Sequence, residues 1–246
     1  MSTVSLTLLS VLAVSVISLA GVLLLSLSAR FLRRAMFILV SFSTGVLLGN
    51  VFLHILPEVM ESGEALTAKM AVALAGVIGS FALEKFIHWR HCHDLDCRAA
   101  IHPAGPLILA GDAVHNAIDG VLIATAYLVS AELGLATTVA VVMHEIPQEF
   151  GDFAVLLHSG YTRGRALFFN FLSALTALLG ALAVLLLARE MRGAGEWLLP
   201  LAAGNFLYIA GADLIPELHR DTKPHHALVQ ICAIVLGIAV MYGFIA

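Results

Sequence analysis

The sequence predicts an all-α polytopic membrane protein with eight transmembrane helices. Hydrophobic residues make up 60% of the 246 residues and charged residues only 12%, about half the charged fraction of a soluble domain. The mean hydropathy is +0.97. Apolar runs of about 20 residues, long enough to cross a hydrocarbon core about 30 Å thick, recur along the chain. All loops are short, so we expect residues 1–246 to form a single transmembrane domain.

The predicted helices follow the apolar runs in chain order. They span residues 4–28, 35–57, 66–88, 104–130, 133–157, 165–188, 197–217 and 226–246, with ends defined to a few residues. The first run has no basic residue before it and is followed by "RFLRR", which favours an uncleaved helix over a signal peptide. The third run is the least apolar, because Lys69 and Glu84 lie near its ends. A seven-helix alternative would omit this run.

The basic residues support the count of eight and orient the helices. Alternate loops hold Arg30, Arg33, Arg34, Lys85, Arg90, Arg98, Arg163, Arg165, Arg220 and Lys223, whereas the opposite side holds only Lys69, Arg189 and Arg192. Loops rich in Lys and Arg face the cytoplasm. We therefore expect both termini on the non-cytoplasmic side of the plasma (inner) membrane, and the longest polar loop, residues 84–103, in the cytoplasm.

A short internal echo predicts an inverted repeat. "FLHILPE" (52–58), near the end of the second helix, resembles "GADLIPE" (211–217), near the end of the seventh. These two helices run in opposite directions. The echo therefore suits a 3+2+3 arrangement, in which an inverted repeat flanks a central hairpin made of helices 104–130 and 133–157.

Each helix of the central hairpin carries one polar stripe. In "GDAVHNAIDG" (111–120) the polar positions follow the spacing i, i+3, i+4, i+7, which places them on one face of a helix. In "HEIPQEFGD" (144–152) the polar positions fall within an arc of about 140° by the same periodicity. The two stripes consist of Asp112, His115, Asn116 and Asp119, and of His144, Glu145, Gln148, Glu149 and Asp152.

The stripes are expected to meet inside the membrane. If the hairpin turns at "SAELG" (130–134), Asp119 lies level with His144, and His115 lies level with Gln148. This level is about 12 residues, or 18 Å of helix, from the turn and thus near the membrane midplane. Pro147 leaves one helix carbonyl without its usual donor, which is tolerated where polar groups supply another.

These side chains predict a site for a divalent transition metal. The alternative is that they only join two helices by hydrogen bonds, but ionisable groups are too costly inside a membrane for that role alone to explain so many. Imidazole, carboxylate and amide ligands without a thiolate suit Zn²⁺, Fe²⁺, Mn²⁺ or Cd²⁺ better than Na⁺ or an organic substrate. A proton relay would use the same residue types, but the paired histidines favour a metal.

At these residues the chain resembles the ZIP (Zrt/Irt-like) family of divalent-metal transporters. "HNAIDG" is similar to the family's fourth-helix motif and "HEIPQEFGD" to its fifth-helix motif, in the form typical of the histidine-rich subfamily. The resemblance implies transport of metal, zinc first, into the cytoplasm, often by a homodimer. It also implies one metal site at His115, Asp119, His144 and Gln148, and an adjacent site at Asn116, Glu145, Asp119 and Glu149. Gln148 departs from the family, whose members have histidine or glutamate there.

Other polar residues are weaker candidates. A transport pathway would include His54, Glu58, Asp112, Asp152, Asp213 and Glu217, although helix capping explains several of them equally well. The cytoplasmic loop gathers His88, His91, Cys92, His93 and Cys97, which would capture exiting metal or belong to an ordinary solvated loop. Gly45 and Gly49 predict a close contact between helices.

The main functional alternative is a membrane-embedded zinc hydrolase. "HEIPQ" resembles the metalloprotease pattern H-E-x-x-H, but Gln148 replaces the second histidine. We therefore expect a transporter rather than an enzyme, with metal as cargo and no catalytic cofactor. The expected partners are divalent metal ions and the lipid bilayer, not nucleic acid.

Overall fold

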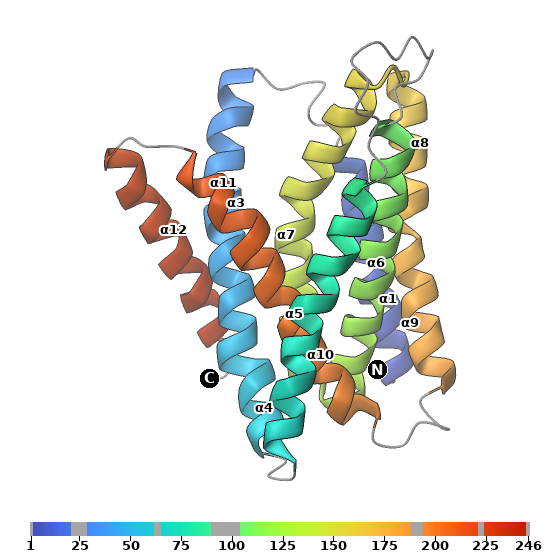
Figure 1. Ribbon diagram of the computed structural model, residues 1–246, viewed down its shortest axis with the longest axis vertical. Helices are drawn as coiled ribbons and strands as arrows, with labels where there is room; N and C mark the ends of the chain where they lie inside the picture. The colour runs from blue at the N-terminus through green and yellow to red at the C-terminus, as the bar shows by residue number, and fades with distance from the viewer. Residues whose placement is uncertain are drawn as a thin grey trace.

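A computed structural model describes residues 2–20, 29–61, 65–89, 104–187, 194–220 and 224–244, which form helices and short turns without any strand (Figure 1). The helices are α1 (Thr3–Ile17), η1 (Ser18–Ala20), α3 (Ala29–Asn50), η2 (Val51–Ile55), α4 (Leu56–Glu61), α5 (Leu66–Trp89), α6 (Ala104–Val129), α7 (Ala131–His158), α8 (Arg163–Ala174), α9 (Thr176–Leu187), α10 (Ala194–Tyr208), η3 (Ile209–Leu214), α11 (Ile215–His219) and α12 (Pro224–Tyr242).

Several helices join end to end into longer rods. α1 continues into η1, α3 through η2 into α4, α8 into α9 with a break at Leu175, and α10 through η3 into α11. The described residues thus form eight rods, at the positions of the eight predicted helices.

Some of these rods are long and apolar enough to cross a membrane. The stretches long and apolar enough to cross a bilayer are Met36–Glu61, Leu66–Lys85, Arg163–Leu187 and Glu196–His219, while Thr3–Ile17 and His226–Tyr242 are shorter apolar helices. α6 and α7, which carry the polar stripes, belong to neither set. The chain is an all-α membrane protein.

The central hairpin turns more tightly than expected. α6 ends at Val129 and α7 begins at Ala131, so that Ser130 alone separates them. Ser130 caps α7, because its side chain accepts a hydrogen bond of 3.0 Å from the backbone N–H of Leu133. Such a cap satisfies one of the donors that the first turn of a helix leaves free. The turn is therefore centred on Ser130 rather than spread over residues 130–134.

The two segments of the internal echo fold alike. Each contains a π-helical stretch, η2 or η3, followed by a short α-helix that begins with an apolar residue and a proline, Pro57 or Pro216. A π-helical turn bonds each N–H to the carbonyl five residues earlier, and it often marks functional regions of helices. The sequence echo thus reflects a shared local structure.

Small residues bring pairs of helices into close contact. A Cβ placed on Gly45 of α3 would lie 2.0 Å from the carbonyl oxygen of Ile234 on α12. A Cβ on Gly120 of α6 would likewise lie 1.8 Å from the carbonyl oxygen of Ala177 on α9. Gly49 also packs on α12, against Met241, which confirms the close contact predicted from Gly45 and Gly49. Small interface residues are typical of helix packing in membranes.

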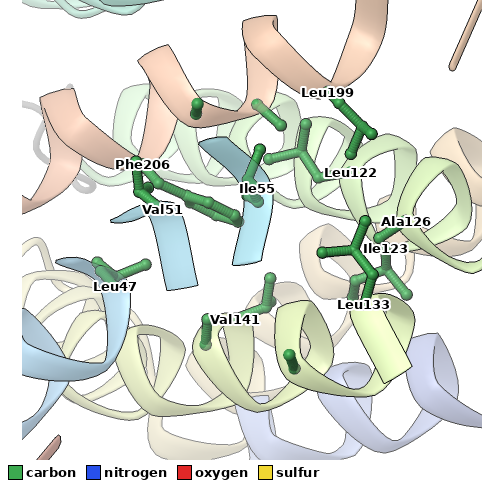
Figure 2. Close-up of a cluster of buried hydrophobic side chains, with 14 of the residues drawn as sticks. Leu47, Val51, Ile55, Leu122, Ile123, Ala126, Leu133, Val141, Leu199 and Phe206 are labelled. Atoms are coloured by element: carbon green, nitrogen blue, oxygen red, sulfur yellow. The ribbon is translucent and has the colours of Figure 1, made fainter. Parts of the chain in front are cut away.

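A buried apolar cluster lies where α3, η2, α6, α7 and α10 meet (Figure 2). Its members include Leu47, Val51, Ile55, Leu122, Ile123, Leu133, Val141, Leu199 and Phe206. Phe206 borders the polar centre, since its ring lies edge-on to His144 with 6.0 Å between ring centroids. The cluster therefore packs directly against the polar residues of the hairpin.

Candidate metal centre

The hairpin buries both polar stripes in the helix bundle. Two of the nine residues keep partial exposure: His115, whose side chain is 21% exposed, and the half-buried Gln148. The buried residues are Asp112, Asn116, Asp119, His144, Glu145, Glu149 and Asp152. Ionisable side chains at such positions need partners or a bound cation.

Four side chains converge into a cluster that we call the histidine group: His115, Asp119, His144 and Glu145. Nε2 of His144 lies 3.2 Å from Nε2 of His115 and 3.2 Å from Oδ2 of Asp119. Oε1 of Glu145 lies 3.4 Å from Nε2 of His115 and 3.9 Å from that of His144. Ligand atoms around a tetrahedral zinc ion lie about 3.3 Å apart, because the bonds are about 2.0–2.1 Å long. The four donor atoms thus have the spacing of a zinc site.

The hydrogen bonds of the histidine group leave its ligand atoms free to bind a cation. Nδ1 of His144 lies 3.0 Å from the carbonyl oxygen of Ala140. A carbonyl only accepts, so Nδ1 carries the hydrogen and Nε2 of the neutral ring keeps its lone pair, as in many metal-binding histidines. Both carboxylate oxygens of Asp119 and Oε1 of Glu145 are buried without a hydrogen-bond donor among the described residues. Acceptor atoms facing one another in this way fit a cation between them.

A second cluster adjoins the first and shares one residue with it. Asp112, Glu145 and Glu149 each offer an oxygen within 4.8 Å of the others, and we call them the carboxylate group. Nδ2 of Asn116 donates to Oδ1 of Asp112 over 2.8 Å, while Oδ1 of Asn116 is buried and unpaired among the described residues. This all-oxygen set suits harder divalent ions than the histidine group does. Glu145 belongs to both groups and could bridge two ions.

α8 supplies two further residues that the sequence did not single out. Nδ2 of Asn170 donates to Oε2 of Glu149, and Oγ of Ser173 donates to Oδ2 of Asp112. Both residues are buried. Their spacing of i, i+3 places them on one face of α8. Isolated polar residues in "FFNFLSAL" were the only sequence signal for this contact.

Gln148 and Asn116 both donate hydrogen bonds to Asp112. Nε2 of Gln148, expected level with His115, lies 3.4 Å from Oδ1 of Asp112 and donates to it. Asp112 lies nearly one helical turn before His115 in α6, whereas Asp119 and His144 meet as expected. Nδ2 of Asn116 donates to the same carboxylate, and Glu145, expected in the adjacent site, also lies beside both histidines.

Of the candidate pathway residues, Asp112 belongs to the carboxylate group, and the other five lie outside both ligand groups. Nε2 of His54 lies 2.9 Å from the carbonyl oxygen of Met241, and Glu58 is exposed. Glu217 forms an exposed ion pair with Arg220 at 2.6 Å. Asp213 lies in η3 and is exposed, whereas Asp152 is buried in α7. In the described part of the chain, neither Asp152 nor these four candidates joins the histidine or carboxylate group.

The predicted cytoplasmic cluster lies largely beyond the described residues. His91, Cys92, His93 and Cys97 fall in the segment 90–103, and His88 falls in the last turn of α5, where side chains are not described.

The fold and the two side-chain groups define a class: an all-α integral membrane protein whose interior carries His, Asp and Glu side chains that could hold a metal ion. The sequence profile of the ZIP zinc transporter family matches residues 4–102 and 90–245 of this chain. The chain belongs to the ZIP zinc transporter family.

Individual relatives agree with this assignment. The chain is 36% identical over 223 residues to zinc transporter ZIP13 of Pongo abelii, covering 84% of this chain and 66% of that protein. It is 34% identical to zinc transporter ZIP13 of Mus musculus, covering 82% and 68% of the two chains. Identity to zinc transporter zipt-7.2 of Caenorhabditis elegans is 29%, covering 83% and 57%. The chain thus spans about two thirds of the length of these two ZIP13 proteins. Members of the family are transporters rather than enzymes, which removes the alternative of a zinc hydrolase.

Proposed function

We propose that this protein carries a divalent transition-metal cation, Zn²⁺ in the first place, across the membrane into the cytoplasm. The histidine group is the observation that carries the proposal. Two imidazole nitrogens and two carboxylate oxygens lie at ligand spacing in the interior of a membrane protein, and three of the four side chains are buried. Relatives named zinc transporters support zinc as the cargo, and the same ligands also accept Fe²⁺, Mn²⁺ and Cd²⁺.

The proposed first metal position is bound by His115, Asp119, His144 and Glu145. Glu145 lies at ligand spacing to His115, Asp119 and His144 of the expected set, while Gln148 of that set donates to Asp112. The nitrogen ligands favour zinc over Mg²⁺ or Ca²⁺, which prefer oxygen.

The proposed second position is bound by Asp112, Glu145 and Glu149, with Asn116 beside them. Gln148 contributes here through Asp112 rather than through the histidines. Because both positions use Glu145, they lie close together. A cation bound in one position therefore repels a cation in the other and weakens its binding.

We also propose that all eight rods cross the membrane in a 3+2+3 arrangement with both termini on the non-cytoplasmic side. The asymmetry of basic residues and the matching π-helical segments η2 and η3 support it. Residues 1–246 then act as a single transport domain, as a homodimer in the plasma membrane.

In this orientation the apolar cluster of Figure 2 lies on the outer side of the metal centre. Leu133, Leu199 and Ile55 belong to the outer ends of their rods and are all nearly fully buried. An ion at His144 is therefore separated from the exterior by packed side chains, and uptake requires these rods to part. The structure fits a state that is closed toward the outside.

Metal flux into sealed proteoliposomes tests the proposal. Vesicles containing the purified protein should accumulate labelled zinc inside, and excess unlabelled Cd²⁺, Mn²⁺ or Fe²⁺ on the loading side should compete according to preference. Empty vesicles and vesicles with the Asp119→Ala variant should not accumulate zinc. Equal accumulation by Asp119→Ala and the unchanged protein would contradict the assigned centre.

A further inference from the structure

Ser43 makes a hydrogen bond between two rods, next to the metal centre. It is fully buried on α3, and its Oγ donates to the backbone carbonyl of Met143 on α7. Met143 directly precedes His144 and Glu145, two members of the histidine group. The contact therefore joins α3 to the stretch of α7 backbone that carries metal ligands.

The carbonyl of Met143 needs a donor from another helix because of Pro147. In an α-helix this carbonyl would accept from the N–H four residues later, but proline at 147 has none. A buried carbonyl without a partner costs about 1–3 kcal/mol. Pro57 and Pro216 follow π-helical stretches, where the bonding pattern shifts to the next donor, whereas α7 is α-helical through Pro147. Ser43 supplies the missing donor in α7.

α3 holds Ser43 in a fixed place. Gly45 and Gly49 pack directly against the backbone and side chains of α12, and Gly237 of α12 packs against the carbonyl of Phe42. Such close backbone packing leaves little room for α3 to shift. Ser43 therefore fixes the Met143 carbonyl from an anchored helix.

We propose that Ser43 is a positioning residue of the metal centre. It donates in place of the N–H that Pro147 lacks, and it fixes the backbone of α7 so that His144 and Glu145 face α6. The inference rests on the proposed function, because it takes the histidine group to be the place where metal binds. Among the described residues, Ser43 forms no hydrogen bond to a side chain of the histidine group.

Substitutions at Ser43 separate the hydroxyl from the shape of the side chain. Ser43→Ala and Ser43→Val remove the donor, and Ser43→Thr keeps it, with Thr and Val nearly equal in shape. Ser41→Ala is the matched control, since the Ser41 hydroxyl donates within its own helix, to Phe37, over 2.8 Å. Zinc affinity is measured by equilibrium titration of purified protein, alongside thermal stability without metal.

The expected result depends on the hydroxyl. Ser43→Ala and Ser43→Val should bind zinc between about threefold and about twentyfold more weakly, the range that corresponds to hydrogen bonds between membrane helices. Ser41→Ala should bind as the unchanged protein does, and Ser43→Thr should bind more tightly than Ser43→Val. A change below twofold in Ser43→Ala, or equal affinities for the Thr and Val variants, would overturn the proposal.

Pro147→Ala gives the second and sharper measurement. Alanine restores the N–H at 147, so that the Met143 carbonyl regains its partner within α7 and the hydroxyl of Ser43 becomes dispensable. In that background Ser43→Ala should change zinc affinity less than twofold. If Ser43→Ala weakens zinc binding as much in the Pro147→Ala protein as it does with Pro147 present, Ser43 acts in another way. If Pro147→Ala does not fold, the comparison of Thr with Val at position 43 decides alone.

These outcomes are distinct from a failure of the proposed function. If the unchanged protein binds no zinc, the metal centre itself is wrong. If it binds zinc and the Ser43 variants bind equally well, only the positioning role is wrong.

Discussion

Replacing Gln148 by glutamate tests whether its side chain lies beside Asp112 and whether an added carboxylate strengthens metal binding in the carboxylate group. Nε2 of Gln148 now donates to Oδ1 of Asp112 over 3.4 Å. Gln148→Glu puts a carboxylate oxygen in that position and turns a hydrogen bond into a like-charge contact. At 3.4 Å and an effective dielectric constant of about 20, the repulsion between two full charges is about 5 kcal/mol. Rotation of the new side chain relieves part of it, so we expect the metal-free protein to lose about 1–5 kcal/mol of stability.

Bound metal should reverse this loss. The additional carboxylate lies beside Asp112 in the carboxylate group, so a divalent ion there replaces repulsion by attraction. The unchanged protein is expected to hold one zinc ion tightly, in the histidine group, and a second weakly. Gln148→Glu should raise the zinc content toward two per chain at matched free zinc, and zinc should stabilise it more than it stabilises the unchanged protein.

The assay is thermal unfolding with and without zinc, together with elemental analysis of metal per chain. Gln230→Glu is the matched control, because Nε2 of Gln230 donates over 2.9 Å to the carbonyl of Leu218, outside both ligand groups. The Gln230→Glu variant should lose the same amount of stability in the presence of zinc as in its absence. Unchanged metal-free stability and metal content in Gln148→Glu would refute the placement beside Asp112, and two tightly bound ions in the unchanged protein would refute the single strong site.

Three further predictions concern the centre, the packing and the loop. Asp119→Ala should reduce zinc uptake to background with normal membrane expression, because Asp119 lies between both histidines, and substantial uptake would exclude it as a ligand. Gly120→Ala should destabilise the protein by about 1–3 kcal/mol or more, since the new Cβ would meet the Ala177 carbonyl at 1.8 Å. Gly79→Ala, with open space around it, should be nearly neutral in the same unfolding assay. Serine in place of the histidines and cysteines of residues 88–97 should alter regulation or apparent affinity in the uptake assay, and complete loss of flux in folded protein would place the loop in the pathway.

Much of the molecule follows from local sequence patterns. Apolar runs of membrane length place the eight rods, because a helix is the simplest way to satisfy backbone polar groups in lipid. The spacing of His115 and Asp119, and of His144 and Glu145, puts each pair on one helix face whatever surrounds it. The meeting of the two stripes followed from the short turn between them, and the contact of Asp119 with His144 confirms that expectation.

The tertiary structure decided the pairing across the hairpin and the contacts from other rods. Gln148 donates to Asp112, about one helical turn from His115 in α6, while Asp119 still meets His144. Asn170 and Ser43 reach the centre from α8 and α3, distant in sequence, and their own helices look like ordinary apolar spans. Helical periodicity fixes which side chains share a face, but the depth at which two faces meet depends on how closely small residues let the helices approach.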